Sequence, residues 1–438
     1  MQSREPTQAR QADQPDSSDH PPAEEGGPDA ARARLASNLR RHGPPLSASV
    51  HAAFARVPRH VFVPEIEPAA AYRDEAFVIK CGQDGLPVSS SSQPAMMAIM
   101  LDQLGLEPGH RVLEIGTGTG YNAAVMSAVV GPAGEVVTVD IDPQLVARAR
   151  SSLLAAGFDT VTVKCADGGY GDPGGAPFDR VIVTAGAWDI APAWLSQLDH
   201  GGRLVLPLAI RGIQLSVGLE RAGEAWLSTS AWRCGFVRML GAFAGPEEVI
   251  RLGEPSELAF QVSDGSQVDA PGLWAALAGG DAHDESVAPE LATVADVADL
   301  DLWLTMTATN LDRLTVVSVP ASWPGLTPLP PFGALVVSAT KTDDLGIATL
   351  MPIDAGLPDP GGGWPGAFVR GLGPAGPDLA VRLAALSARW AELGRPGSHN
   401  LAMLVWLGSE LPSEAPEGWL VFERPSVTIA AGWPVSSP

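Results

Sequence analysis

The sequence predicts an α/β fold, in which a doubly wound parallel sheet over residues 46–245 precedes a second, C-terminal α+β domain over residues 246–438. Short apolar segments alternate with helical stretches from Leu46 to about Gly241, which is typical of a parallel sheet covered by helices. Beyond about Gly245 the composition changes: Pro and Gly become frequent, and 24 acidic residues stand against 8 basic ones from Pro246 onward. A length of 438 residues also favours two domains over one.

Residues 1–45 are predicted to form a disordered N-terminal tail. They are rich in Gln, Pro, Asp, Glu and Arg, and they lack a sustained hydrophobic period. A helix from about Ala30 to Arg41 is the one regular element that their pattern allows. No basic start is followed by an apolar core, so we expect no secretory signal.

In the first domain, strands and helices follow each other along the chain. The predicted strands are short apolar or β-branched runs at Arg111–Ile115, Glu135–Asp140, Thr160–Lys164, Arg180–Thr184 and Arg203–Pro207. The helices predicted between them are Asn122–Val130, Pro143–Ala156 and Pro192–Leu198. Gln214–Glu220 and Ala225–Ala231 are separated only by a short turn, and we expect them to close the sheet as an antiparallel hairpin.

The second domain is predicted to contain strands and one clear amphipathic helix. The strand-like runs are Asp301–Thr307, Ala334–Ala339, Leu401–Leu407 and Trp419–Glu423. The helix extends from about Asp378 to Leu393, and its apolar face is predicted to consist of Leu379, Val381, Leu383, Leu386 and Trp390.

Charge and cysteine content exclude several classes of protein. A net charge of −22 argues against nucleic acid or an anionic membrane as the main partner. The three cysteines are too widely spaced for a zinc site or a disulfide framework, so no metal is predicted, and Cys165 is expected to be a small buried residue. No apolar run approaches the ~18 residues that span a bilayer, and we expect a cytoplasmic protein.

A glycine-rich turn after the first predicted strand indicates a cofactor site. In Glu114-x-Gly116-x-Gly118-x-Gly120, glycines allow the backbone to approach a ligand closely and to adopt positive φ. NAD-binding folds use a similar turn, and a plain strand-to-helix turn is the other alternative. The GxGxG spacing and the acidic Glu114 favour S-adenosylmethionine, because a carboxylate attracts the cationic methionine portion and would repel a pyrophosphate.

Two further acidic positions follow the next strands. Asp140 ends the second strand, where a carboxylate can accept hydrogen bonds from ribose hydroxyls, and the adjacent Ile141 is included in the predicted cofactor contacts. Asp142 is expected to cap the helix that begins with Pro143. Asp167-Gly168 ends the third strand; alone it is a turn, but in series with the other elements it is predicted to lie beside the adenine.

An ordered series of motifs over about Val57–Gly241 resembles protein-L-isoaspartate O-methyltransferases, which have a Rossmann-like class I methyltransferase fold. The series consists of Val57-Pro-Arg-His60-Val-Phe-Val-Pro64, Ala71-Tyr72-Arg-Asp74, Ser92-Gln93-Pro94, Arg111–Tyr121, Ala166-Asp167-Gly168, Ala176-Pro-Phe-Asp179 and Gly201–Pro207. The resemblance implies an enzyme that uses S-adenosyl-L-methionine to methylate an aspartyl or isoaspartyl carboxylate of a peptide or protein substrate.

The resemblance also implies roles for individual residues. Ser92 is expected to act at the transferred methyl as the catalytic residue. Without the family resemblance, a helix cap is the more common role of a serine in such a segment. Substrate contacts are expected at Ser91 and Gln93, and at Phe236 and Val237 within Gly235–Gly241. The cofactor contacts are expected at Glu114, Gly116, Gly118, Gly120, Asp140, Ile141, Asp167 and Gly168. His60 and Arg59 are expected to order the N-terminal part rather than to act as bases.

The departures from the family pattern all lie on the substrate side. Val88–Pro94 replaces the family's Gly-Gln-Thr-Ile-Ser-Gln-Pro, and Lys80–Pro87 looks enlarged. Ala95 stands where an aromatic residue or His is common, and Arg238 stands where a proline is expected. These changes concern the choice of substrate rather than the cofactor.

Four functional hypotheses follow from the sequence. The long C-terminal part resembles that of actinobacterial relatives that act on ribosomally made, modified peptides such as lanthipeptides and graspetides, and this favours a dedicated tailoring enzyme whose ester product collapses to a succinimide (aspartimide) or isoaspartate. General repair of aged proteins is the second hypothesis, and a peptide-binding module with incidental methylation is the third. A small-molecule O-methyltransferase is disfavoured by the Ser92-Gln-Pro segment and the hairpin.

Overall fold

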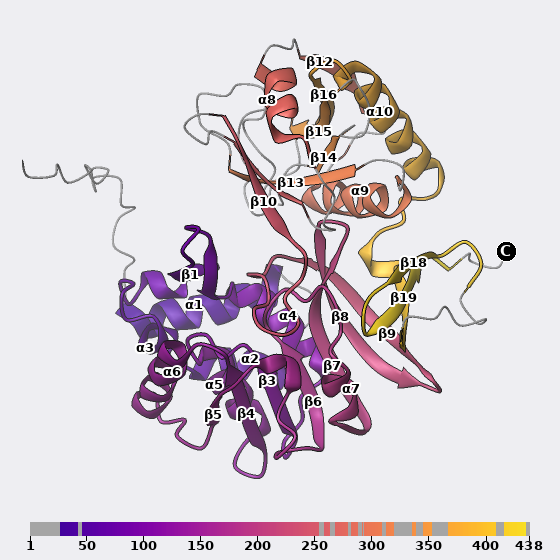
Figure 1. Cartoon of the computed structure of the whole chain (residues 1–438). Coiled ribbons are helices and arrows are strands. Elements are labelled where there is room, and N and C mark those ends of the chain that lie inside the picture. The colour runs from indigo at the N-terminus through magenta and orange to yellow at the C-terminus, as the bar shows by residue number, and fades with distance from the viewer. Residues whose placement is uncertain are drawn as a thin grey trace, which may run out of the picture.

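The computed structural model describes twelve stretches of the chain: residues 27–42, 46–253, 258–262, 268–278, 282–287, 291, 293–308, 312–318, 335–338, 345–352, 367–408 and 416–434. They form two sheets with helices packed on them, one above the other in the view of Figure 1. We call the ten-stranded sheet the first sheet and the seven-stranded sheet the second sheet. No helix within these stretches is long and apolar enough to cross a membrane.

The middle of the first sheet is parallel, as the sequence predicts. Its parallel strands lie in the order β5-β4-β3-β6-β7, with bounds Thr162–Cys165 (β5), Glu135–Asp140 (β4), Arg111–Ile115 (β3), Phe178–Val183 (β6) and Leu198–Ile210 (β7). The predicted hairpin follows as β8 (Ile213–Ala222) and β9 (Ala225–Cys234), both antiparallel to their neighbours. The expectation of a doubly wound α/β sheet closed by a hairpin is confirmed.

Helices cover both faces of the first sheet because successive strand residues point to opposite sides. Val112 faces a core that includes α1, α2, α4 and α5, whereas Leu113 faces a second core that includes α7. The helices are α1 (Gly27–His42), α2 (Ala48–Arg56), α3 (Arg59–Phe62), α4 (Pro94–Leu104), α5 (Tyr121–Val130), α6 (Pro143–Ala155) and α7 (Pro192–Ser196). Short 3₁₀ turns lie at Ala70–Tyr72 and Gly168–Tyr170, and a two-stranded hairpin, β1 (Phe77–Cys81) and β2 (Pro87–Ser91), stands apart from the sheet.

The last part of the chain returns to the first sheet. The strands β17 (Ala402–Leu407), β19 (Val427–Gly432) and β18 (Leu420–Glu423) extend it beyond β9 in that order. Val405 of β17 is opposite Trp226 of β9, and Met403, Val405 and Ile429 are buried in the same core as Leu113. The predicted division at residue 245 is therefore not a single boundary, since the free edge of β9 is paired with strands from the end of the chain.

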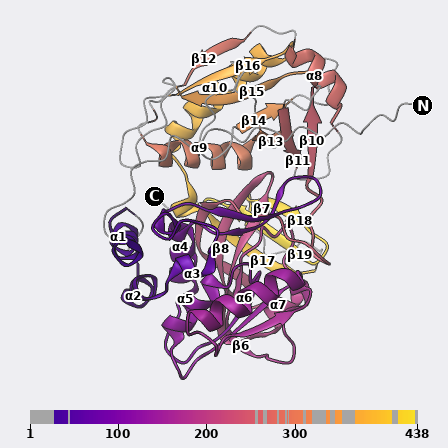
Figure 2. The same cartoon turned by 90° about the vertical axis from the view of Figure 1, so that its left-hand side faces the viewer.

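The second sheet is antiparallel and lies between the hairpin and the last strands in the sequence. Its order is β10-β11-β13-β14-β15-β16-β12, with bounds Glu248–Leu252, Leu258–Val262, Asp312–Ser318, Leu335–Ser338, Ile347–Pro352, Ala367–Leu372 and His283–Ser286. The helices α8 (Ala270–Ala278), α9 (Val294–Thr307) and α10 (Gly376–Glu392) pack against it, and a 3₁₀ turn lies at Ser398–Asn400. Figure 2 shows α9 between the two sheets.

The position of α9 explains why the predicted strand at Asp301–Thr307 is wrong. Leu302 and Met306 are buried in the core of the first sheet, whereas Trp303 and Leu304 are buried against the second sheet. A helix that is buried on two sides has apolar residues on more than one face and loses the single apolar stripe that identifies an amphipathic helix. Its N-terminal capping box at Thr293 and Asp296 is the local signal that the strand prediction overlooked.

Three smaller expectations also need correction. The disordered tail predicted for residues 1–45 is wrong over residues 27–42, which form α1 with Leu35 and Leu39 buried in the core; this is the helix that the sequence pattern allowed from about Ala30 to Arg41. Residues 1–26 and 43–45 lie outside the described stretches. Cys165 is exposed rather than buried, because β5 is the edge strand of the sheet. Val381 is 51% exposed, so the apolar face of α10 excludes it, while Leu379, Leu383 and Trp390 are buried as predicted.

Candidate active site

One cavity lies at the carboxyl ends of the parallel strands, where ligands bind in folds of this class. It has a volume of about 1100 Å³ including its open mouth. The loop 116–119 after β3, Asp140–Asp142 after β4 and Thr184–Ala185 after β6 line it. The end of β2 and residues 236–240 after β9 line it as well, so the cavity brings together residues from the two groups that the sequence assigned to cofactor and substrate.

The glycine loop adopts a backbone that other residues would not tolerate. Gly116 has φ 103° and Gly120 has φ 85°, both in the region that favours glycine. A Cβ at Gly116 would lie 2.5 Å from Oγ1 of Thr184, and a Cβ at Gly120 would lie 3.2 Å from the Cβ of Ala149. The loop therefore passes close to β6 and α6 and leaves its cavity side open for a ligand.

Glu114 is completely buried beneath this loop. Asn122 donates through Nδ2 to Oε1 at 2.7 Å, and Thr138 donates through Oγ1 to Oε2 at 2.6 Å. Burial raises the pKa of Glu114 from 4.5 to about 7, although both hydrogen bonds oppose the shift. A positive charge placed beside this carboxylate would favour its ionised form and would itself be stabilised.

The residues around Glu114 fit the cationic end of S-adenosylmethionine. Asn122 lines the cavity, and its Oδ1 is buried without a hydrogen-bond partner. Buried acceptors without partners are rare, and a ligand that donates a hydrogen bond would satisfy this one. Asn122 Oδ1 and Glu114 together offer an acceptor and a negative charge to an ammonium group, as the cofactor requires.

Asp140 is held in place by backbone groups. The N–H groups of Gly118 and Asp142 each donate to its carboxylate at 3.0 Å. Burial raises the pKa of Asp140, and these hydrogen bonds counteract the effect. Each carboxylate oxygen retains a further lone pair, and both Asp140 and Ile141 line the cavity where ribose hydroxyls are expected.

The next two acidic residues serve the backbone. Asp142 caps α6 by accepting from the N–H groups of Gln144 and Leu145, as predicted, and it also forms an ion pair with Lys80 of β1. Asp167 accepts from the N–H groups of Gly169 (2.9 Å) and Ala242 (2.8 Å). Gly168 and Gly169 line the cavity, so this turn contributes backbone while the Asp167 carboxylate orders the turn itself.

Ser91 and Ser92 line the cavity and are positioned by the buried Arg59. The Arg59 guanidinium donates to the carbonyl oxygens of Ser92 (2.9 Å), Ala71 (3.0 Å), Arg73 (2.9 Å) and Glu75 (2.9 Å). One cation thereby fixes the end of β2 against the preceding loop. Arg59 thus organises the N-terminal part, as expected, and the His60 ring lies 2.8 Å from the Tyr72 hydroxyl in the same region.

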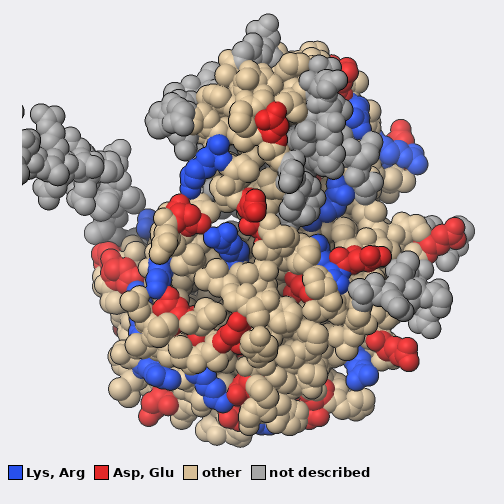
Figure 3. All heavy atoms as spheres, in the orientation of Figure 1, with Lys and Arg blue, Asp and Glu red and all other residues tan. Residues whose placement is uncertain are grey.

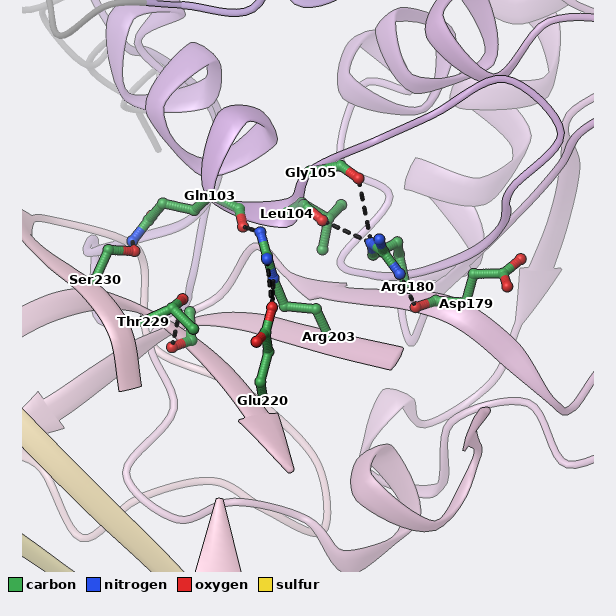
Figure 4. A network of polar contacts seen from close by, with 10 residues as sticks. Gln103, Leu104, Gly105, Asp179, Arg180, Arg203, Glu220, Thr229 and Ser230 are labelled. Atoms are coloured by element: carbon green, nitrogen blue, oxygen red, sulfur yellow. Dashed lines mark hydrogen bonds and ion pairs between the residues drawn. The ribbon is translucent and has the colours of Figure 1, made fainter. Parts of the chain in front are cut away.

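The far end of α4 is anchored to the sheet. Gln103 donates to the Ser216 carbonyl. It also donates to the Ser230 hydroxyl, and Arg203 donates to the Gln103 carbonyl while it is paired with Glu220 (Figure 4). Arg180 donates to the Leu104 carbonyl at 2.7 Å. Because α4 begins at Pro94, these contacts fix the helix that follows Ser92, while Arg59 fixes the end of the strand that precedes it.

The N-terminus of α4 separates the roles of Ser92 and Gln93. Gln93 occupies the N-cap position, but its side chain forms no hydrogen bond with the helix backbone. Instead, Asp74 accepts from the Ala95 N–H (2.8 Å) and from the Gln93 side chain (3.1 Å). Ser92 is therefore not the helix cap, and the exposed Gln93 lies outside the residues that line the cavity.

Phe236 and Val237 line the cavity beside the segment that follows β6. The Val237 carbonyl accepts from Gly186 N–H at 2.8 Å, and the Met239 N–H donates to the Gly186 carbonyl at 3.0 Å. These bonds fix residues 236–240 beside the end of β6. The neighbouring Arg238 also lines the cavity and forms an ion pair with Asp84 in the β1–β2 turn, at 3.0 Å.

Sequence reasoning missed several residues that line this cavity. Asn122 is the second residue of α5 and Thr184 follows β6, and neither has a distinctive local pattern. The contact between Asp84 and Arg238 joins positions 154 residues apart. The only sequence signal for it was that both positions depart from the family pattern.

Comparisons with known proteins agree with this site. The family model described as protein-L-isoaspartate(D-aspartate) O-methyltransferase matches residues 30–242. The protein-L-isoaspartate O-methyltransferase of Methanopyrus kandleri is 40% identical over 221 residues, which cover 50% of this chain and 95% of the relative. Protein-L-isoaspartate O-methyltransferase 2 of Archaeoglobus fulgidus is 43% identical over 180 residues, 41% of this chain and 79% of the relative.

Two solved structures with the same description are also similar. A protein-L-isoaspartate O-methyltransferase aligns with a TM-score of 0.47 and 22% identity, over 85% of this chain and 96% of the other. A putative one from Plasmodium falciparum, in complex with S-adenosyl-L-homocysteine, aligns with a TM-score of 0.41 and 20% identity, over 50% and 98% of the two chains.

The relatives match this chain over nearly their whole length, and the matched region contains the cavity and every residue assigned to it from the sequence. The chain therefore belongs to the protein-L-isoaspartate O-methyltransferase family, whose members are carboxyl methyltransferases that use S-adenosyl-L-methionine.

Proposed function

We propose that this protein esterifies an aspartyl or isoaspartyl carboxylate of a polypeptide. The observation that carries the proposal is one shared cavity, which is lined by Glu114 and residues 116–119 of the glycine loop and also by Ser91, Ser92 and residues 236–240. The family model described for isoaspartate matches residues 30–242, which include both groups.

The cofactor residues have separate tasks in this proposal. Glu114 and Asn122 bind the ammonium group, the Gly116–Gly120 loop lies along the methionine portion, and Asp140 binds the ribose. Ile141 and the Gly168 backbone border the adenine. S-Adenosylmethionine supplies a methyl group that is already activated by its bond to a sulfonium.

The acceptor needs orientation rather than activation. A carboxylate has a pKa near ~4 and is ionised at neutral pH, so no general base is required. The Ser92 hydroxyl donates to one carboxylate oxygen and thereby aims the other, while Arg59 keeps Ser92 in place through its carbonyl. Phe236 and Val237 contact the peptide and exclude water from the acceptor.

We propose further that the acceptor belongs to a dedicated peptide of the ribosomally made, modified kind. What supports this is the mouth of the cavity: the β1–β2 turn is enlarged, Arg238 replaces the family's proline, and Arg251 of β10 donates to the Asp84 carbonyl at 3.0 Å. The second sheet thus contacts the β1–β2 turn, and a contact of this kind would let it take part in the choice of substrate. The nitrogen of the following peptide bond would then attack the ester carbonyl, form the ring C–N bond and lose its proton, while the C–OCH3 bond breaks and methanol leaves, which gives a succinimide.

General repair of isoaspartyl residues in aged proteins is the second candidate. The similarity to relatives named protein-L-isoaspartate O-methyltransferase over 95% of their length favours it. The residues of the glycine loop and the Ser92-Gln-Pro segment serve either function equally.

Two peptides offered with labelled cofactor would distinguish the candidates. One is a short linear peptide with a single isoaspartate, and the other is a cyclised peptide with a single aspartate. The dedicated function predicts faster esterification of the cyclised peptide, followed by succinimide formation. Rapid turnover of the linear isoaspartyl peptide, with none of the cyclised one, would instead establish repair.

A further inference from the structure

The ion pair between Arg238 and Asp84 lies at the mouth of the cavity. The Arg238 side chain is 37% exposed and that of Asp84 is 40% exposed, so both are accessible from solution. Arg238 nevertheless counts among the residues that line the cavity, next to Val237. Its guanidinium is therefore placed where a bound peptide would leave the cavity.

Asp84 is held in position independently of Arg238. Its Oδ1 accepts from the Leu86 N–H at 3.1 Å, while Oδ2 accepts from Arg238 at 3.0 Å. Its carbonyl accepts from Arg251 of β10. Figure 2 shows the β1–β2 hairpin extending toward β10 and β11, and Figure 3 shows acidic and basic side chains at the hollow between the two parts of the molecule.

The local positive charge matters because the chain as a whole is strongly acidic. A net charge of −22 repels acidic peptides. A cation at the mouth of the cavity would offset this repulsion for one acidic residue of the substrate. The backbone N–H of Arg238 lies between the two bonds that Val237 and Met239 make with Gly186 and takes no part in them. These two bonds therefore require neither the N–H nor the side chain of Arg238.

We infer that Arg238 is a specificity-determining residue that recognises an acidic side chain next to the acceptor residue of the substrate. The inference rests on the proposed function, because the acceptor itself is taken to lie deeper, at Ser92. Asp84 occupies the guanidinium in the free protein, and the carboxylate of the substrate replaces it. Arg238 thus makes the same kind of bond before and after the peptide binds, but to a different partner.

The test compares two isoaspartyl peptides that differ only in the residue after the isoaspartate, Glu in one and Gln in the other. Their dissociation constants are measured in the presence of S-adenosylhomocysteine, and their kcat and KM values are measured with S-adenosylmethionine. For a charge-assisted bond at a half-exposed site we expect the Glu peptide to bind about three- to tenfold more tightly. Arg238→Gln should abolish this preference, Arg238→Lys should keep part of it, and the effect should appear in KM more than in kcat.

Asp84→Asn provides an independent arm. Asparagine retains the oxygen that accepts from Leu86, but it no longer competes as an anion for Arg238. The preference for the Glu peptide should therefore increase in Asp84→Asn and should vanish in the double variant with Arg238→Gln. Arg389→Gln is the matched control, because Arg389 forms an exposed ion pair with Glu392 on α10, away from the cavity.

The outcomes separate this inference from the function it rests on. Equal binding of the two peptides by the unchanged protein, or a preference that survives Arg238→Gln, would overturn the role of Arg238 even if both peptides are methylated. Peptides that bind with the expected preference but are never methylated would contradict the proposed function and leave the recognition by Arg238 supported.

Discussion

The C-terminal strands are expected to be part of the fold that binds the cofactor, and Val405→Ala tests this. Val405 of β17 is fully buried, lies opposite Trp226 of β9 and shares a core with Leu113 of β3. Alanine removes two carbons, which are worth about 1.6 kcal/mol at roughly 0.8 kcal/mol each, and the cavity left behind adds to this. We expect the free energy of unfolding to fall by about 2–3 kcal/mol.

Val421→Ala is the matched control. Val421 lies on the neighbouring strand β18 and is 37% exposed, so the same chemical change should cost less than about 0.5 kcal/mol. Urea unfolding should be followed by two signals for each variant: tryptophan fluorescence for the whole chain, and bound S-adenosylhomocysteine for the cavity.

A fold shared between the two ends of the chain predicts that both signals shift together in Val405→Ala. Met403 N–H donates to the Ser228 hydroxyl at 2.8 Å, and the nearly buried Arg233 and Asp301 pair β9 with α9, so several contacts besides Val405 couple these strands to the first sheet. A loss of fluorescence at lower urea, with S-adenosylhomocysteine binding unchanged from the unaltered protein, would refute the coupling and restore an independent domain boundary near residue 245.

Three further predictions concern the cavity. Ser92→Ala should lower kcat at least tenfold while the affinity for S-adenosylhomocysteine changes by less than about twofold, because the hydroxyl is assigned to the acceptor; an equal loss of both would contradict that assignment. Arg59→Met should lower the free energy of unfolding in urea by roughly 3 kcal/mol or more, because four carbonyl groups lose their charged donor. A change below about 1 kcal/mol would show that Ser92 is positioned by other contacts. Glu114 has a raised pKa in the folded protein, so the folded state holds an extra proton between pH 4.5 and about 7, and the free energy of unfolding without ligand should fall by about 3 kcal/mol as the pH rises through this window. Glu114→Gln should remove that fall, and it should also remove the rise in S-adenosylhomocysteine affinity that ionisation of Glu114 produces over the same window; an unchanged pH profile would mean that another group titrates.

The sequence was most informative about features that depend on residues close together in the chain. The glycine loop, the Asp142 cap and the parallel strands from β3 to β7 follow from local patterns of spacing and hydrophobicity, and the structure confirms each of them, whereas the order of these strands in the sheet comes from the structure alone. The exposed edge residue Cys165 was misjudged because a strand pattern does not state which strand lies at the edge of the sheet.

Long-range pairings could not be predicted in this way. Nothing in the composition of Ala402–Leu407 indicates that it pairs with β9, which ends 168 residues earlier, and α9 was read as a strand because both its sides are buried. The partners of Glu114 also depend on the fold, since Thr138 reaches it from the adjacent strand β4. The glycine loop predicts a class of ligand from local sequence, whereas the contact between Arg238 and Asp84 forms only when two segments 154 residues apart meet.

The central claim is that this cavity transfers a methyl group to a carboxylate of a peptide, and ester analysis tests it most directly. The protein is incubated with methyl-labelled S-adenosylmethionine and either an isoaspartyl peptide or the same peptide with asparagine at that position. We expect label on the isoaspartyl peptide alone, released as methanol by mild base and reduced at least tenfold in Ser92→Ala. Label that resists base, or equal labelling of the asparagine peptide, would contradict the account.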